Sequence, residues 1–239
     1  MRLDKYLSGM GAGTRSEIKK AVKAGLVTVD GAVASDPGMH VTEDSAVTFR
    51  GRQVVYEDFV YYMMNKPAGV ISASDDSREE TVVDLIDGQK RKDLFPAGRL
   101  DRDTEGLLLI TNDGQLAHRL LSPKHHVDKK YYALVSGEVT DDDVSTFAEG
   151  LTLPDGLECL PAELRVLRVK NAAAAMSEVE VTIQEGKFHQ IKRMFLAIGK
   201  EVLCLKRLTM GPLALDESLA PGEYRRLTEE ELENLKSHV

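Results

Sequence analysis

The sequence has only two cysteines, Cys159 and Cys204, which lie far apart and form neither a CxxC nor a Cys/His pattern. Such a pair predicts two buried thiols in a reducing compartment, and excludes a disulfide framework or zinc site. There is no signal-peptide core and no run of about 18 apolar residues, so we expect a soluble, cytoplasmic protein. The glycines of residues 9–13 follow no strand, and no P-loop or Rossmann fingerprint is present elsewhere.

Basic charge is also scarce overall, because 31 lysines and arginines face 39 acidic residues for a net charge of −8. This balance argues against a nucleic-acid partner. However, residues 1–25 and 185–207 each hold six basic residues against two acidic ones, whereas acid collects at residues 141–143 and 229–231. An acidic protein with two basic faces is compatible with RNA binding.

The first fifty residues have the pattern of a small α/β module. Leu3, Tyr6 and Leu7 follow a helical spacing, and Thr14 with Glu17 forms a capping box before a second helix that Gly25 would end. Residues 26–29 predict a strand and residues 30–31 a tight hairpin turn. We expect this module to close near residue 51 and a short linker to fill residues 52–58, which gives a first domain of residues 1–58.

The remaining residues, 59–239, predict a second and larger domain. The pattern predicts helices near residues 115–121 and 189–198, and strands at 60–64, 131–135, 163–169, 178–184 and 202–205. This mixture predicts an α+β fold with a mixed, mostly antiparallel sheet.

Three segments of this domain carry residues suited to chemistry. In Gly98–Gly106, Asp101 lies between Arg99 and Arg102, whose charges favour its ionised form. A charged carboxylate can act as a nucleophile or a base, although a surface salt bridge has the same pattern. Alternatively, Asp101, Asp103 and Glu105 alternate as Mg²⁺ ligands of a nuclease would on one strand face, but the two arginines oppose such a cluster.

The second segment, residues 125–131, ends in Tyr131 at the start of a predicted strand, where it is either a half-buried strand residue or a ring that stacks on a base. The third, residues 185–195, contains His189 one helical turn before Lys192. No second ligand follows His189 at four residues, so we expect a hydrogen-bonding and not a metal-binding histidine.

Together the segments GRLDRDTEGLLLITNDG, Lys129-x-Tyr131 and GKFHQIKRMF resemble the three motifs of the pseudouridine synthase family, and look most like its small-ribosomal-subunit (RsuA) branch. Residues 1–51 resemble the S4-type RNA-binding domain. The resemblance implies that Asp101 is the catalytic residue and attacks C1′ or removes the C2′ proton of a uridine. It also implies that Lys192 pairs with Asp101, that Tyr131 stacks on the uracil, and that Leu205 packs beneath the site. The reaction that the resemblance implies, isomerisation of uridine to pseudouridine, needs no cofactor and no metal.

The partner implied is rRNA. Residues expected to contact it are Arg2, Lys5, Arg15, Lys19, Lys20 and Lys23 in the first domain, and Lys66, Arg99, Arg102, Lys129, Lys187, His189, Gln190 and Arg193 in the second. The resemblance points to one uridine of 16S rRNA, of the uridine 516 type, in a small-subunit assembly intermediate. A two-domain enzyme that clamps RNA can work as a monomer, and we expect a monomer here. Two alternatives stay open: a synthase that acts on 23S rRNA, and a non-catalytic RNA-binding factor for ribosome assembly. An RNA methyltransferase would need a Gly-rich methyl-donor loop, which the sequence lacks.

Overall fold

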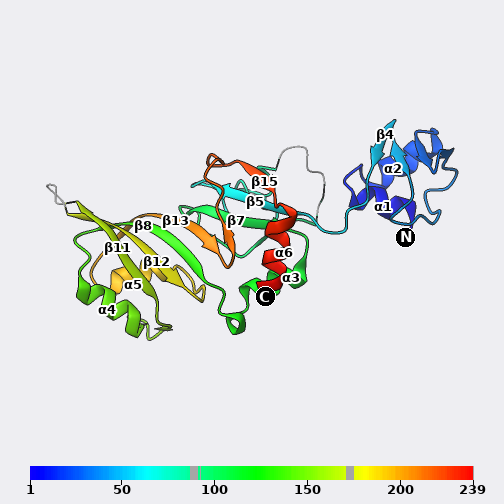
Figure 1. The fold of residues 1–239 in the computed structure, drawn as a ribbon. Coiled ribbons are helices and arrows are strands. Elements are labelled where there is room, and N and C mark those ends of the chain that lie inside the picture. The colour runs from blue at the N-terminus through cyan, green and yellow to red at the C-terminus, as the bar shows by residue number, and fades with distance from the viewer. Residues whose placement is uncertain (87–90, 92, 171–174, 239) are drawn as a thin grey trace. The chain divides into compact units, whose positions relative to one another are not determined.

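The computed structural model of the protein describes residues 1–86, 91, 93–170 and 175–238. The chain divides into two compact units, drawn in Figure 1. Unit 1 comprises Met1–Val60 and Ile86–Leu94, and unit 2 comprises Tyr61–Leu85 and Phe95–Val239.

Unit 1 packs two helices against a small antiparallel sheet. The helices are α1 (Leu3–Gly9) and α2 (Arg15–Lys23), and the sheet has the order β2-β1-β3-β4. Its strands are β1 (Val27–Val29), β2 (Ala32–Val33), β3 (Val47–Phe49) and β4 (Arg52–Val54). Leu3, Tyr6 and Leu7 are buried in the core of this unit, as their helical spacing predicted.

Local signals in unit 1 act as the sequence predicted. The Thr14 hydroxyl accepts a hydrogen bond from the Glu17 backbone, and the Thr14 backbone donates to the Glu17 carboxylate at 2.8 Å, so the capping box is complete. Asp30 and Gly31 have φ values of 51° and 82°, which are those of a type I′ hairpin turn.

The predicted linker is wrong at its start, because residues 52–54 form strand β4 and pair with β3. Arg50 and Gly51 cause this pairing with φ values of 52° and 77°, a second turn in which both central residues are left-handed. An arginine before glycine carried no signal for such a turn.

Unit 2 is built on a nine-stranded sheet. Its helices are α3 (Gly114–Leu121), the short 3₁₀ turn η1 (Pro123–His125), α4 (Asp141–Glu149), α5 (Gln190–Ala197) and α6 (Glu229–His238). Its strands are β5 (Tyr61–Lys66), β6 (Phe95–Ala97), β7 (Glu105–Thr111), β8 (Lys129–Ser136), β9 (Leu151–Thr152), β10 (Glu158–Cys159), β11 (Glu163–Lys170), β12 (Met176–Ile183), β13 (Val202–Met210), β14 (Leu213–Ala214) and β15 (Tyr224–Arg226).

The sheet runs in the order β11-β12-β8-β13-β7-β5-β15, with β14 beside β13 and β6 beside β7. Only the β13–β7 pair is parallel among the pairings of the described strands, which confirms the predicted α+β class with a mostly antiparallel sheet. Gly106 permits this central pairing. Its φ is 99°, and a Cβ atom there would lie 2.3 Å from the Arg207 carbonyl oxygen.

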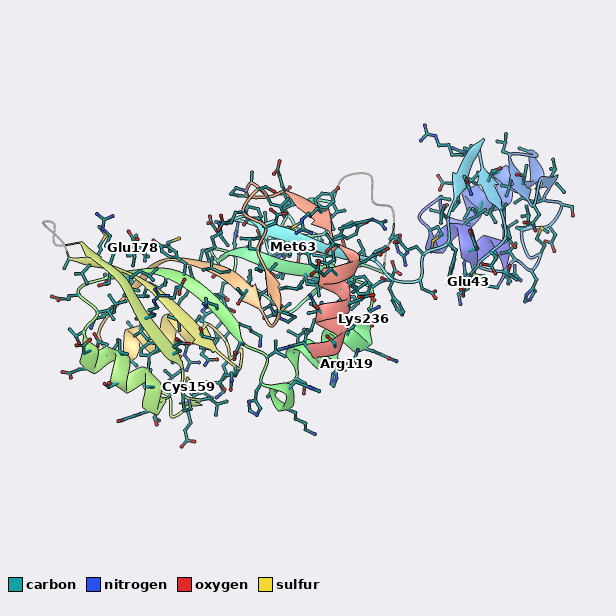
Figure 2. All side chains as sticks on the ribbon, viewed as in Figure 1. Glu43, Met63, Arg119, Cys159, Glu178 and Lys236 are labelled. Atoms are coloured by element: carbon teal, nitrogen blue, oxygen red, sulfur yellow. The ribbon has the colours of Figure 1, made fainter. Side chains whose placement is uncertain are left out.

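The helices of unit 2 cover the two halves of its sheet separately. In Figure 1, α4 and α5 lie together beside β8, β11 and β12, and the rings of Phe147 and Phe195 join them at 4.9 Å between centroids. Helices α3 and α6 pack on the other half, whose core contains the fully buried Met63. Figure 2 shows Met63 within the sheet, whereas the charged Arg119 and Lys236 of these helices are exposed. Strands β13 and β7 therefore lie where two separately packed halves meet.

No helix in the described ranges is long and apolar enough to cross a membrane. Both cysteines are free thiols, but only Cys159 is buried. Cys204 is partly exposed on β13, so the prediction of two buried thiols is wrong for this residue.

Candidate active site

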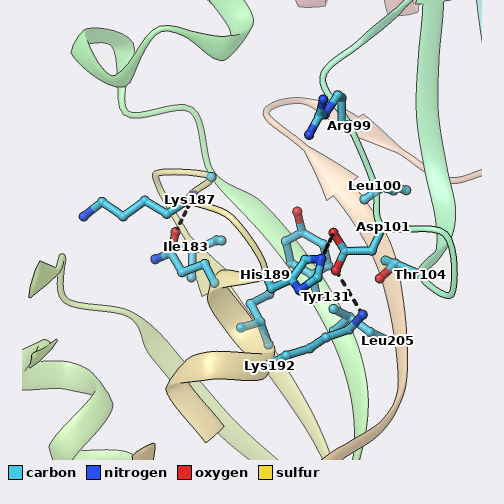
Figure 3. A pocket seen from close by; sticks show the side chains of 13 residues that line it. Arg99, Leu100, Asp101, Thr104, Tyr131, Ile183, Lys187, His189, Lys192 and Leu205 are labelled. Carbon is cyan, nitrogen blue, oxygen red and sulfur yellow. Dashed lines mark hydrogen bonds and ion pairs between the residues drawn. The ribbon is translucent and has the colours of Figure 1, made fainter. Parts of the chain in front are cut away.

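Asp101 lies in the turn that leads from β6 into β7, at the edge of a pocket in unit 2. The Thr104 backbone N–H donates to the Asp101 carbonyl at 3.1 Å, and Gly98 enters the turn with a φ of 90°. The Asp101 side chain is 26% exposed, and Figure 3 shows its carboxylate directed into the pocket toward Tyr131. The turn therefore presents one carboxylate to the pocket, and a hydrogen bond within the turn holds its backbone.

Lys192, in α5, is the cation that contacts this carboxylate. Its ammonium nitrogen lies 2.9 Å from Oδ2 of Asp101 and 2.5 Å from Oδ1 of Asp103 (Figure 3 shows the first contact). Burial acts to lower the pKa of Lys192, but its hydrogen bonds to Asp103 and Asp101 outweigh burial and raise this pKa. Lys192 is thus a permanent cation between two carboxylates at neutral pH.

His189 lies beside the other carboxylate oxygen of Asp101. Its Nε2 lies 3.5 Å from Oδ1, and its ring stacks on Phe188 with 3.8 Å between centroids. His189 precedes α5 in the left-handed conformation, with a φ of 49°. A non-glycine residue in this region stores strain, and such strain concentrates at functional sites. The backbone at His189 therefore turns its ring toward Asp101 at an energetic cost.

The pocket floor comes from adjacent strands of the sheet. Tyr131 on β8 and Ile183 on β12 are buried, as is Leu205 on β13, and all three line the pocket with Asp101. Burial alternates along β8, so Tyr131 faces the pocket side and Tyr132 the opposite face. A flat ring, two aliphatic side chains and a charged carboxylate thus surround one space.

Lys66 corrects one prediction, because it is fully buried and unavailable to RNA. Its ammonium donates to three backbone carbonyls, those of Pro67 at 2.8 Å, Thr104 at 2.9 Å and Arg102 at 3.3 Å. Burial lowers the pKa of Lys66 to about 8, and the carboxylates of the Asp101 turn offset part of this effect. Through these hydrogen bonds Lys66 holds the backbone of residues 102–104, just after Asp101, in place.

Lys129 and Gln190 are also buried, which contradicts direct RNA contacts from the protein surface. Lys129 donates to the Val127 carbonyl at 2.8 Å. The Gln190 amide donates to the Glu185 carboxylate at 2.6 Å and accepts from the Lys187 backbone, so it ties together the loop before α5.

The two arginines beside Asp101 in sequence do not supply its charge partner. Arg102 donates to the Gly69 carbonyl at 3.0 Å and pairs with Glu79 at 3.1 Å. Arg99 is exposed at the rim of the pocket. Its ion-pair partner is Lys192, the residue to which the family resemblance pointed, and neither of the neighbouring arginines.

The other residues predicted to contact RNA are at least partly accessible. In unit 2, Lys187 pairs with Glu185 and Arg193 with Asp155. Those of unit 1 are all exposed: Arg2, Lys5, Arg15, Lys19, Lys20 and Lys23. Arg15, Lys19 and Lys23 follow one another at intervals of four residues in α2, so they lie on one side of the helix.

Two residues at this site had no role in the sequence prediction. Phe188 is 69% exposed at the rim, and Arg207 is 2% exposed and lines the adjoining cavity with Asp101 and Tyr131. A signal for Phe188 was its position inside the third motif. A signal for Arg207 was its place two residues after Leu205 on the same strand, which puts both side chains on one face.

The alternative of a Mg²⁺ cluster is not supported by the geometry. Only Glu105 belongs to β7, so the three acidic residues do not alternate along one strand. The Lys192 ammonium lies between the carboxylates of Asp101 and Asp103, where a metal ion would have to bind. Among the residues that the structure describes, no group of three or more His, Cys, Asp or Glu side chains is arranged to hold a metal.

Two parts of the chain match known protein families. Residues 60–197 match the family described as RNA pseudouridylate synthase, and residues 1–47 match the S4 domain. The chain belongs to the RNA pseudouridylate synthase family and is an isomerase with an amino-terminal S4 domain.

Relatives in this family align with the whole chain. The chain is 51% identical to "Uncharacterized RNA pseudouridine synthase YtzG" of Bacillus subtilis, over 97% of each chain. It is 43% identical to "Ribosomal small subunit pseudouridine synthase A" of Vibrio cholerae, over 98% of this chain and 99% of the relative. A solved structure described as "Crystal structure of pseudouridylate synthase" is 37% identical and has a TM-score of 0.68, over 98% of this chain and 99% of the other.

Proposed function

We propose that this protein isomerises one uridine of 16S rRNA, of the uridine 516 type, to pseudouridine. The observation that carries this proposal is the Asp101 carboxylate, which faces the Tyr131 ring and is held by Lys192 at 2.9 Å. The small-subunit target is supported by full-length relatives named for that activity, such as the Vibrio cholerae protein. The substrate would be a small-subunit assembly intermediate, and the enzyme would act as a monomer.

In the proposed reaction, Asp101 either attacks C1′ of the flipped uridine or removes its C2′ proton, and the N1–C1′ bond breaks. Lys192 holds the carboxylate ionised and oriented, and Tyr131 stacks on the uracil in place of its former neighbours in RNA. The uracil then turns and its C5 joins C1′, after which Tyr131 assists removal of the C5 proton. Leu205 supplies apolar packing beneath the ring.

RNA binding would involve both parts of the chain. We place the boundary between the RNA-binding and catalytic domains at residues 58–59. The exposed basic side of α2 would bind phosphates through Arg15, Lys19 and Lys23. At the rim of the pocket, the exposed Phe188 ring would stack on a base next to the target uridine.

The test is a site-by-site pseudouridine map of total rRNA from cells that lack this protein and re-express variants of it. The wild type should restore one pseudouridine in 16S rRNA, and Asp101→Asn should not. Asp103→Asn is the matched control, because Asp103 binds the same ammonium but is 73% exposed.

The outcomes separate the proposal from its alternatives. A lost and restored site in 23S rRNA would replace the target but keep the chemistry. A site restored equally by Asp101→Asn would refute the catalytic role of Asp101. A map unchanged by loss of the protein would support a non-catalytic RNA-binding factor.

A further inference from the structure

Arg207 is a buried cation whose hydrogen bonds are incomplete. The side chain is 2% exposed, its Nε donates to the Leu107 carbonyl at 2.7 Å, and its Nη2 has no hydrogen-bond partner. Within the described ranges, no carboxylate forms an ion pair with this guanidinium. A buried, unpaired donor of a charged group costs free energy, so its retention calls for a function.

The strand register places Arg207 at the active site. Arg207 on β13 lies directly opposite Tyr131 on β8, and both line the cavity that also contains Asp101. Thr104, whose buried hydroxyl also lacks a partner, lines the pocket that contains Asp101 and Tyr131. Two side chains with unpartnered polar atoms therefore line the hollow around Asp101 and Tyr131.

A second buried cation lies beside Arg207. Lys129, two residues from Tyr131 on the same face of β8, lines the same cavity and donates only to the Val127 carbonyl within the described part of the chain. Burial, and after it the nearby charge of Arg207, lower the pKa of Lys129 to about 8. The carboxylate of Asp128 attracts Lys129 but is exposed and accepts from Gln184. This part of the cavity therefore carries excess positive charge, which a bound anion would compensate.

The burial of Arg207 indicates which anion this is. Arg207 is 2% exposed and lines the cavity beside Tyr131, so a flat base inserted next to Tyr131 suits its position better than a phosphate of the RNA backbone. When the N1–C1′ bond of uridine breaks, its electron pair remains on the uracil and spreads from N1 to O2 and O4. The detached uracil is thus an anion in a buried site, where a fixed positive charge stabilises it most.

We propose that Arg207 is a catalytic residue whose guanidinium donates to a uracil oxygen and stabilises the anionic uracil between cleavage and rejoining. The anion then forms the C5–C1′ bond, loses the proton from C5 and gains one at N1, so atoms and electrons balance without a further reactant. This inference rests on the proposed isomerisation.

The test compares Arg207→Met with wild type in single-turnover reactions on the 16S rRNA substrate and on the same RNA with 5-fluorouridine at the target position. Fluorine makes uracil a better leaving anion. Loss of Arg207 should slow cleavage about 10²-fold on uridine RNA, as removal of one oxyanion donor does elsewhere. The defect on 5-fluorouridine RNA, followed as loss of 5-fluorouridine, should be at least about five times smaller.

Structural damage gives a different result, because it slows both RNAs equally. Equal defects would therefore overturn the proposal. Arg207→Lys keeps the charge and provides a second variant if Arg207→Met does not fold. Arg207→Lys should retain more activity on uridine RNA than Arg207→Met does. The role would again be overturned if Arg207→Lys were as slow as Arg207→Met on uridine RNA and showed the same defect on 5-fluorouridine RNA. Arg165→Met, at a 68% exposed arginine on β11, is the matched surface control. Absence of turnover by the wild type would instead refute the proposed function.

Discussion

Replacement of Lys192 by methionine tests how the active site holds its carboxylate. Methionine keeps the length and the apolar stem but removes the ammonium. At the observed 2.9 Å, the ion pair with Asp101 is worth about 6 kcal/mol at an effective dielectric constant of about 20, and about 1.4 kcal/mol in bulk water. About a quarter of each side chain is exposed, so solvent screens the pair and the value lies between these limits.

This pair energy is the upper limit for what Lys192 contributes to the ionisation and orientation of Asp101. A loss of about 1.4 to 4 kcal/mol in the transition state corresponds to a fall in kcat of about 10- to 10³-fold. KM should change less, because the Lys192 ammonium is already bound by two carboxylates and is not a free phosphate ligand.

The assay is steady-state turnover on the 16S rRNA substrate, with thermal unfolding to confirm that the variants fold. Lys192→Arg should recover part of the lost kcat, because it restores the charge with a different geometry. Asp103→Asn should retain kcat within about threefold, since pairs with such an exposed side chain are weak. A Lys192→Met enzyme with wild-type kcat would refute the reasoning, because Asp101 would then need no cation.

Four further predictions follow from single contacts. Phe188→Ala should raise KM about tenfold and lower kcat much less, because stacking of a base is worth about 1–3 kcal/mol; initial-rate kinetics measure both, and an effect on kcat alone would contradict the stacking role. Gly106→Ala should destabilise unit 2 by about 3 kcal/mol, because its Cβ would lie 2.3 Å from the Arg207 carbonyl and its φ is 99°; a melting temperature equal to that of wild type would be the contrary result. Thr14→Ala should destabilise unit 1 by about 1 kcal/mol in urea unfolding, whereas Ser16→Ala in the same helix should not, since only Thr14 caps α2. Burial lowers the pKa of Lys66 in the folded protein from 10.5 to about 8, so the unfolded chain binds more protons between these pH values. The free energy of unfolding should therefore rise from pH 8 to 10.5. Lys66→Met should show a smaller rise, and equal slopes in the two proteins would contradict the assignment.

Several features were predictable from the sequence because they depend on neighbouring residues. The capping box at Thr14, the turn at residues 30–31 and the alternating strand around Tyr131 each follow from local hydrogen bonds or side-chain periodicity. Asp101, Tyr131 and Lys192 were found as candidates because each lies inside a recognisable motif. The α+β class followed from the mixture of these local patterns.

Other local elements were missed although their signals were present. Helix α4 begins with a capping box between Thr140 and Asp143, but its acidic first turn was read only as a cluster of charge. Helix α6 likewise begins with three glutamates, which favour the amino-terminal end of a helix dipole. Each of these helices packs through few apolar residues, so its acidic amino-terminal end was the stronger signal in the sequence and the helix was not predicted.

Charge pattern alone did not decide which charges meet. It pointed to Arg99 and Arg102 as partners of Asp101, and only the family resemblance pointed to Lys192. The contact itself depends on tertiary structure, because α5 packs next to the β6–β7 turn in unit 2. A lysine in the sequence carries no mark of burial, so Lys66 and Lys129 were predicted to contact RNA from the surface. Whether these two lysines are buried depends on pairings between strands that are distant in the sequence. The pairing of β13 with β7 on one side and with β8 on the other puts Arg207 opposite both Gly106 and Tyr131. Register across a sheet is set by the packing of its two faces and not by either strand alone.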